Sequence, residues 1–120
     1  MTNTQKNRLI EVFMGWELKW SNEEGKRGWA FYNVESKEYL HKTTYADSFI
    51  GFTTDWNWLI QALKKFDTLL EQNLLNINVV DFREYSKICD HIDYSVTLYN
   101  IDDAVNALCE GIEWYNSTLN

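Results

Sequence analysis

The sequence contains no proline, no internal repeat and no low-complexity segment, and it has only two cysteines and two histidines. No apolar run approaches the roughly 18 residues that a membrane-spanning helix needs. The N-terminal stretch MTNTQKNRLI has no apolar segment behind its basic residues, so it does not resemble a secretory signal. These absences predict a cytoplasmic protein that neither enters nor crosses a membrane. A cytosolic compartment also argues against a disulfide between Cys89 and Cys109.

What is present is typical of a globular protein. The chain has 120 residues, of which 45% are hydrophobic and 24% charged, and this predicts one domain over residues 1–120. The aromatic share of 16% is high. Because each large ring removes much apolar area from water, such a chain can build a sizeable core at this length.

Basic residues are scarce in the last third of the chain. The net charge is −7, and residues 76–120 carry eight acids against only Arg83 and Lys87. Direct nucleic-acid binding needs lysines and arginines that replace counterions, so this composition argues against it. It suits a basic partner, including a protein whose own task is to bind nucleic acid.

The first half of the chain predicts one helix followed by strands. Apolar residues at helical spacing predict a helix over residues 5–14, with Thr4 as its N-cap and Gly15 as its stop. Alternation over residues 16–20 and aromatic runs over 29–34 and 38–43 predict three strands. Residues 21–28 and 36–38 are rich in turn formers, and residues 46–52 suggest a further short extended piece.

The strongest helical signal covers residues 54–74, with Thr53 or Thr54 as the cap. At about 100° per residue, its apolar side chains sweep an arc of about 200°, with Trp56 and Trp58 near the two edges. A surface helix needs a narrower stripe. We therefore expect this helix to be central, with one neighbour on each flank.

Residues 76–99 allow more than one interpretation. Residues 76–80 are compatible with a strand, residues 82–92 fit a short helix capped by Asp81 as well as an extended segment, and residues 94–99 favour a strand by composition. A clearer helix follows over 101–117, capped by Asn100, with Gly111 allowing a close crossing. Its predicted buried stripe consists of Ile101, Val105, Leu108, Ile112 and Tyr115. The predicted fold is α+β: a small single domain in which an antiparallel sheet packs against about three helices.

Few residues suggest catalysis or metal binding. The run CDHID gathers Cys89, Asp90, His91 and Asp93, but zinc sites need a second Cys/His pair, which is missing. The acids that follow Cys89 oppose the lowered thiol pKa that a nucleophile requires, and Cys109 lies on an apolar helix stripe typical of a buried thiol. We therefore expect no catalytic, cofactor-binding or metal-binding residues.

Aromatic residues gather in the predicted strands. Stacking of bases or of a small molecule on such rings requires basic neighbours, and the glutamates nearby cancel the lysines and arginine there. Packing in the core is the favoured interpretation. The residues are Trp16, Trp20, Trp29, Phe31 and Tyr32.

The outward arc of the helix over 101–117 carries Asp102, Asp103, Glu110 and Glu113 with no lysine or arginine among them. An exposed helix selected for stability alone usually mixes in basic residues four positions away. The arc is either a solubilising face or a docking face for a cationic surface. We take it as the candidate partner-binding surface, together with Asp81, Glu84, Asp90 and Asp93.

Three short motifs resemble a family of small, mostly uncharacterised phage and prophage accessory proteins. They are FMGW at residues 13–16, WNWL at 56–59 and WYN at 114–116. The family has no catalytic assignment, so the resemblance implies structural roles for these positions and a bacterial host cell as the setting. It also implies an accessory gene of a mobile element, and small acidic proteins of that origin often inhibit host defence systems.

The expected function is a non-enzymatic inhibitor of a host defence nuclease, anti-CRISPR-like, which binds a basic nucleic-acid-binding protein through its acidic surface. The alternative is a pocket protein that binds a small molecule or nucleotide between the aromatic hairpin and the helix over 54–74. An enzyme that uses Cys89 and His91 is a weaker third possibility. The sequence does not determine the oligomeric state.

Overall fold

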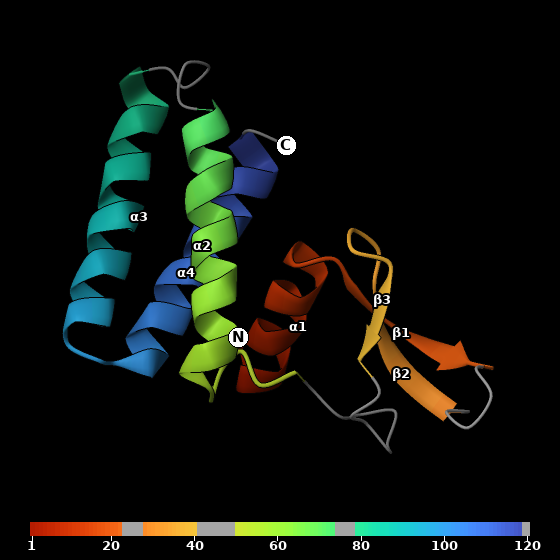
Figure 1. The fold of residues 1–120 in the computed structure, drawn as a ribbon. Coiled ribbons are helices and arrows are strands. Elements are labelled where there is room, and N and C mark those ends of the chain that lie inside the picture. Colours follow the sequence, from red (N-terminus) through yellow and green to blue (C-terminus); the bar gives the residue numbers. More distant parts are fainter. Residues whose placement is uncertain (23–27, 41–49, 74–78, 119–120) are drawn as a thin grey trace.

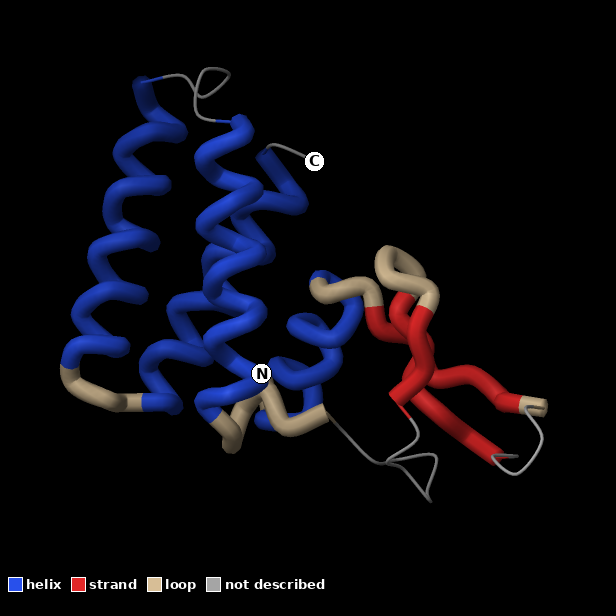
Figure 2. Tube along the Cα trace, viewed as in Figure 1, coloured by secondary structure: helices blue, strands red, loops and turns tan. Residues whose placement is uncertain are grey.

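A computed structural model describes residues 1–22, 28–40, 50–73 and 79–118. Within these ranges the chain forms four helices and a three-stranded antiparallel sheet, which confirms the predicted α+β class (Figures 1 and 2). In chain order the elements are α1 (Asn3–Phe13), β1 (Trp16–Ser21), β2 (Gly28–Asn33), β3 (Glu38–Leu40), α2 (Trp56–Asn73), α3 (Val79–Thr97) and α4 (Ile101–Thr118). No helix in the described ranges is long and apolar enough to cross a bilayer.

Helix α1 begins two residues earlier than the sequence predicted. Its N-cap is Thr2, not Thr4, and Thr2 forms a reciprocal capping box with Gln5. The predicted stop at Gly15 is confirmed, because this residue adopts a φ of +82° that favours glycine. The side chain of Asn33 then fixes the end of α1 to the hairpin by donating to the carbonyl of Met14 at 2.9 Å.

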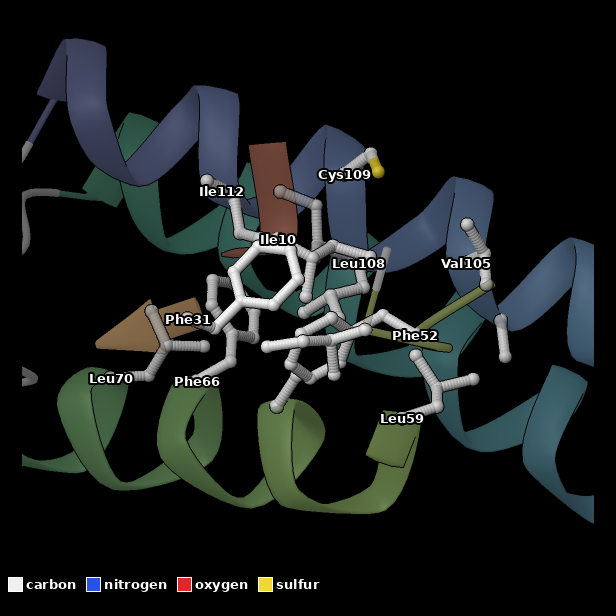
Figure 3. Packing of buried hydrophobic residues seen from close by; sticks show 14 residues of the cluster. Ile10, Phe31, Phe52, Leu59, Phe66, Leu70, Val105, Leu108, Cys109 and Ile112 are labelled. Atoms are coloured by element: carbon white, nitrogen blue, oxygen red, sulfur yellow. The ribbon is translucent and has the colours of Figure 1, made fainter. Parts of the chain in front are cut away.

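The three strands form an antiparallel sheet in the order β1-β2-β3, which lies beside α1 (Figure 2). The register pairs Leu18 with Phe31, and the face that carries them packs against the helices. On this face, Phe31 is fully buried within the helical core (Figure 3). The predicted extended piece at residues 46–52 is not a strand where it is described, since residues 50–52 form a bend and turn. Its first part, residues 46–49, lies outside the described residues, as do 41–43 and most of the predicted turn at 21–28.

Helix α2 begins at Trp56 and is capped by Asp55 rather than by Thr53 or Thr54. The Asp55 carboxylate accepts a hydrogen bond from the backbone N–H of Asn57 at 2.9 Å. The prediction that Trp56 and Trp58 mark the edges of the buried arc is confirmed, since both are half-buried and pack against the core. Trp58 makes edge-to-face contacts with Trp16 of β1 and with Phe52.

The segment that the sequence left open is a single helix over its described part. Helix α3 runs without interruption from Val79 to Thr97. The strand interpretations of residues 79–80 and 94–97 are therefore wrong, and Asp81 lies inside the helix instead of capping it. Residues 76–78 lie outside the described ranges. Apolar side chains at helical spacing, including buried Ile88 and half-buried Ile92, give this helix an inner face that outweighs the β-prone composition of its end.

The central helix is α4, not α2 as the sequence predicted. Helix α4 packs against α1, α2 and α3, and Asn100 caps it as expected by accepting from the N–H of Asp103. Its buried positions include Val105, Leu108 and Ile112 from the predicted stripe (Figure 3). The outer two positions of that stripe, Ile101 and Tyr115, are half-buried. Three small residues extend the buried surface around the helix: Ala104, Ala107 and Gly111. The three neighbouring helices can therefore approach it closely.

Gly111 allows the close crossing that the sequence predicted. A Cβ atom built at this position would lie 2.5 Å from Cζ of Phe66 and 3.0 Å from Cγ2 of Ile88. The phenyl ring from α2 and the isoleucine from α3 thus meet over the bare backbone of α4. The packing of three helices depends on the missing side chain.

We expect Gly111→Ala to lower the net free energy of unfolding by about 1–2 kcal/mol, because the added methyl group overpacks the contact with Phe66 at a cost of about 2–3 kcal/mol. The substitution nevertheless improves helix propensity by about 1 kcal/mol. Urea unfolding followed by circular dichroism measures the difference. Asn106→Ala, at an exposed position of the same helix, is the control and should be neutral or stabilising. A Gly111→Ala protein as stable as the unchanged one would contradict this account of the crossing.

A buried carboxylate joins α1 to the segment before α2. Glu11 is only 2% exposed, and its Oε1 accepts hydrogen bonds from Nδ2 of Asn7 at 2.6 Å and from the N–H of Ile50 at 3.2 Å. Its other oxygen pairs with Arg8 at 3.0 Å. Burial raises the pKa of Glu11 above its ordinary value of 4.5, against the opposing effect of Arg8 and the hydrogen bonds.

This raised pKa gives Glu11 a recognisable effect on stability. The folded state holds the proton more tightly than the unfolded chain, so the contribution of Glu11 is largest below pH 4.5 and is lost as pH rises through the folded-state pKa. We expect the unchanged protein to lose stability relative to Glu11→Gln as pH rises from 4.5 towards neutrality. Thermal unfolding of both proteins across this range measures the difference. A difference that stays constant or grows in favour of the unchanged protein would contradict the assignment.

Candidate functional site

The exposed face of α4 carries the four acids that the sequence singled out. Asp102, Asp103, Glu110 and Glu113 are all exposed, and we call them the acidic strip. At about 100° per residue they fall within an arc of about 100° along the helix. The positions of α4 that meet Phe66 of α2 are buried, so the strip lies on the side of α4 turned away from α2.

The four carboxylates of the acidic strip form no salt bridge within the described part of the chain, although Lys6 and Glu113 both lie close enough to Cys109 to affect the pKa of its thiol. No lysine or arginine there forms a salt bridge with any of its four carboxylates, and the last turn of α4 has no basic residue. Asp103 alone has a structural role, because its Oδ2 accepts from Nδ2 of Asn100 at 2.9 Å next to the helix N-terminus. Asp102, Glu110 and Glu113 therefore present their charge to solvent.

Of the four acids predicted on the preceding segment, the three with described side chains do not extend this strip into one surface. Glu84 is exposed and pairs with Lys87 at 3.4 Å. Asp93 lines a groove between α2 and α3, and Asp90 lies close enough to Cys89 in that groove to influence the pKa of its thiol. The side chain of Asp81 lies outside the described residues. Helix α3 thus carries acids on more than one side, because it is continuous and its residues point in turn around the axis.

The groove between α2 and α3 was not predicted from the sequence. We call it the α2–α3 groove; its volume is about 620 Å³. Both helices pack on α4, and the groove lies between them. Apolar side chains from both helices dominate its lining: Ile60, Leu63, Phe66, Leu70, Ile92 and Val96. The wide apolar arc of α2 is a usable signal: it predicts one neighbour on each flank, whereas part of the arc on the α3 side lines the groove.

Cysteine chemistry finds little support in the geometry. Burial raises the pKa of the Cys89 thiol; a hydrogen bond with Tyr85 lowers it, and Asp93, Asp67 and Asp90 raise it further. Cys109 is buried as predicted, and burial raises its pKa to about 11. Both thiols are free, and each environment opposes the thiolate that a nucleophile needs. Across the described residues no three His, Cys, Asp or Glu side chains come together as a metal site.

The aromatic residues of the hairpin divide between core and surface. Phe31 and Trp16 pack inward as predicted, whereas Trp20 is 54% exposed. Tyr32 lies on the opposite face of the sheet, with its ring 4.6 Å from Nζ of Lys19 and 4.8 Å from the ring of Tyr39. The side chain of Trp29 lies outside the described residues. Core packing therefore accounts for only part of this group.

The pocket that the sequence placed between the hairpin and the helix over 54–74 has only a partial counterpart among the described residues. A hollow of about 400 Å³ lies between α1, α2 and the end of α4, and the hairpin contributes Glu35 to its lining. Lys65 of α2 reaches across this region, pairing with Glu35 at 2.6 Å and donating to the carbonyl of Phe13 at 2.5 Å. Lys65, the cation in the described lining of this hollow, is therefore already paired with groups of this chain.

Comparison of the chain with protein-family models, with curated proteins and with solved structures found no match. The resemblance to phage and prophage accessory proteins therefore stays a prediction.

The raised thiol pKa values predict slow alkylation of the folded protein. With a pKa near 11 instead of 9.0, Cys109 holds about a hundredfold less thiolate at pH 8 than an ordinary cysteine, and it is buried as well. In a Cys89→Ser protein we expect iodoacetamide to modify Cys109 at least that much more slowly than after unfolding in urea. Mass spectrometry over time measures both rates. Equal rates in the folded and unfolded protein would show that Cys109 is accessible and reactive.

Proposed function

We propose that this protein is a non-enzymatic binding protein whose acidic strip docks on the basic surface of a nucleic-acid-binding protein. The observation that carries the proposal is the exposure of Asp102, Glu110 and Glu113 without a salt bridge to any described lysine or arginine. Carboxylates left in solvent on one side of a helix favour a cationic partner, since complementary charge steers association and fixes orientation.

The mechanism we propose is competition with phosphate. A channel that binds nucleic acid lines its walls with lysines and arginines, and carboxylates spaced along a helix offer those side chains alternative anionic partners. The strip projects from α4, which is held by three neighbouring helices, so its carboxylates share a rigid support. Binding of this kind weakens as salt rises because the contacts are exposed and ionic.

The partner class we propose is a bacterial host defence nuclease, with the protein acting as a phage or prophage inhibitor of the anti-CRISPR kind. This step depends on the resemblance in FMGW, WNWL and WYN, and on the acidity of the chain, with its net charge of −7. The same acidity argues against direct binding to nucleic acid. The raised thiol pKa values support a role without cysteine catalysis.

A small-molecule pocket protein is the second candidate, and the α2–α3 groove is the observation that favours it. Its volume of about 620 Å³ falls within the range of ligand sites. In the part of the lining that the structure describes, Lys64 is the one basic residue, and Asp67 and Asp93 are both present. A nucleotide phosphate would therefore meet a predominantly anionic lining, which makes the nucleotide form of this alternative the weaker one.

Reversing the strip should abolish partner binding without unfolding the protein. The sharpest variant is Asp102→Lys, Glu110→Lys and Glu113→Lys together, which leaves the cap partner Asp103 intact. Affinity purification from the bacterial host at low and high salt identifies the partner. Titration of the purified partner then measures affinity, with a nucleic-acid duplex as competitor. We expect the unchanged protein to compete with the duplex and the triple variant to lose at least tenfold in affinity, or about 1.4 kcal/mol.

The matched control reverses three exposed glutamates elsewhere: Glu17→Lys, Glu38→Lys and Glu84→Lys. It changes the net charge by the same amount but leaves the strip unaltered, so it should retain most of the affinity. Circular dichroism of both triple variants verifies that α4 and the sheet persist. The proposal fails if the strip variant binds the purified partner as tightly as the unchanged protein, or if both variants lose affinity equally.

A further inference from the structure

The α2–α3 groove combines two helical walls with an apolar floor. Its lining extends over residues 60–70 of α2 and 85–97 of α3. The ring of Phe66, which packs on Gly111, forms the floor between the two walls. At 1.5 Å per residue the α2 wall is about 15 Å long. Ile60, at one end of this wall, is 41% exposed. Leu63 and Ile92, on opposite walls, are half-buried, so apolar surface remains open to solvent along the groove.

Acidic side chains surround this apolar surface. Asp67 of α2 and Asp93 of α3 are exposed and line opposite walls. The carboxylates of Glu71 and Asp90 also act on the groove, because Glu71 raises the pKa of Tyr85 and Asp90 that of Cys89 after the larger effect of burial. Among the described residues of the lining, Lys64 is the one cation. The charge around the groove is therefore predominantly negative.

We propose that the α2–α3 groove binds an amphipathic helix of a partner protein, with the apolar face of that helix inside the groove and its flanking lysines or arginines against Asp67 and Asp93. Helices recognise apolar grooves of this kind through residues at i, i+3, i+4 and i+7. A wall of about 15 Å matches about three turns of such a helix. The acidic residues on both walls select a segment with basic flanks over a neutral or acidic one.

The negative charge around the groove also disfavours two other possible occupants, a second copy of this chain and an anionic small molecule. A second copy of this chain would bring its own net charge of −7 to an acidic groove, so self-association is disfavoured. An anionic small molecule meets the same repulsion from Asp67 and Asp93. A cationic amphipathic helix satisfies both the apolar lining and the negative charge.

This site is separate from the acidic strip, and the inference does not depend on the proposed function. The strip lies on the side of α4 turned away from α2, whereas the groove lies between α2 and α3, with α4 behind α2 in Figure 1. One protein can therefore engage a basic surface and a basic amphipathic segment at the same time. The two sites can also fail independently, because different residues form them.

A synthetic peptide tests the groove directly. The probe is a fluorescein-labelled peptide of about 14 residues containing only leucine and lysine, with the leucines at helical spacing. Fluorescence anisotropy at physiological ionic strength gives its affinity for the full chain. Methyl chemical shifts of Ile60, Ile92 and Val96 should move on binding, while those of Val105 and Ile112, buried in the core, should move less. A peptide of the same composition with alternating leucine and lysine, and one with glutamate in place of lysine, should each bind at least about tenfold more weakly.

Two charge-matched variants locate the site. Asp67→Lys with Asp93→Lys should weaken peptide binding at least about tenfold, and Asp102→Lys with Glu113→Lys should change it less than about threefold. Equal losses would mean attraction to the net charge and would overturn the proposal. Equal binding of the alternating peptide would overturn it too. So would sedimentation that shows a dimer dissociated by Ile60→Lys, because a second copy would then occupy the groove.

Discussion

The contact of Phe66 with the bare backbone at Gly111 is the constraint on which the helical part of this protein depends. A Cβ atom at position 111 would overlap that ring, so only glycine lets α2 approach α4 this closely while Ile88 of α3 approaches the same point. Three helices thereby share one crossing. Once α4 is covered in this way, a single side of it faces solvent, and that side carries the acidic strip.

The same crossing accounts for the α2–α3 groove. Helices α2 and α3 both pack on α4, and the apolar arc of α2 is wider than this contact needs. Aromatic side chains cover the side of α2 that faces the hairpin. Trp58 contacts Trp16 of β1, and Phe66 makes an edge-to-face contact with Phe13 of α1. On the α3 side the arc stays open. Both candidate binding surfaces therefore follow from how α4 is packed, although they lie on different sides of it.

The acids of this chain differ in function according to their surroundings. Buried Glu11 accepts hydrogen bonds and holds residue 50 against α1, Asp55 caps α2, and Asp103 accepts a hydrogen bond from Asn100, the cap of α4. Glu84 pairs with a lysine one turn away. The other three carboxylates of the strip, and Asp67 and Asp93 of the groove, form no salt bridge in the described part of the chain. The excess of acids that gives the net charge of −7 therefore includes both structural acids and two groups available for a cationic partner.

Local patterns in the sequence determined the fold class, the extents of α2 and α4 to within two residues, the stop at Gly15, the cap at Asn100 and the exposed acids of α4. Each of these depends on residues within one or two turns of each other. The sequence also placed Gly111 at a crossing and Trp56 and Trp58 at the edges of a buried arc. Only the tertiary structure decided that α3 is one helix, that α4 and not α2 is central, and that a groove remains between α2 and α3. The reason is that a hydrophobic arc specifies how much of a helix is apolar, whereas the neighbour that covers it, or leaves it open, is chosen by packing between segments far apart in the chain.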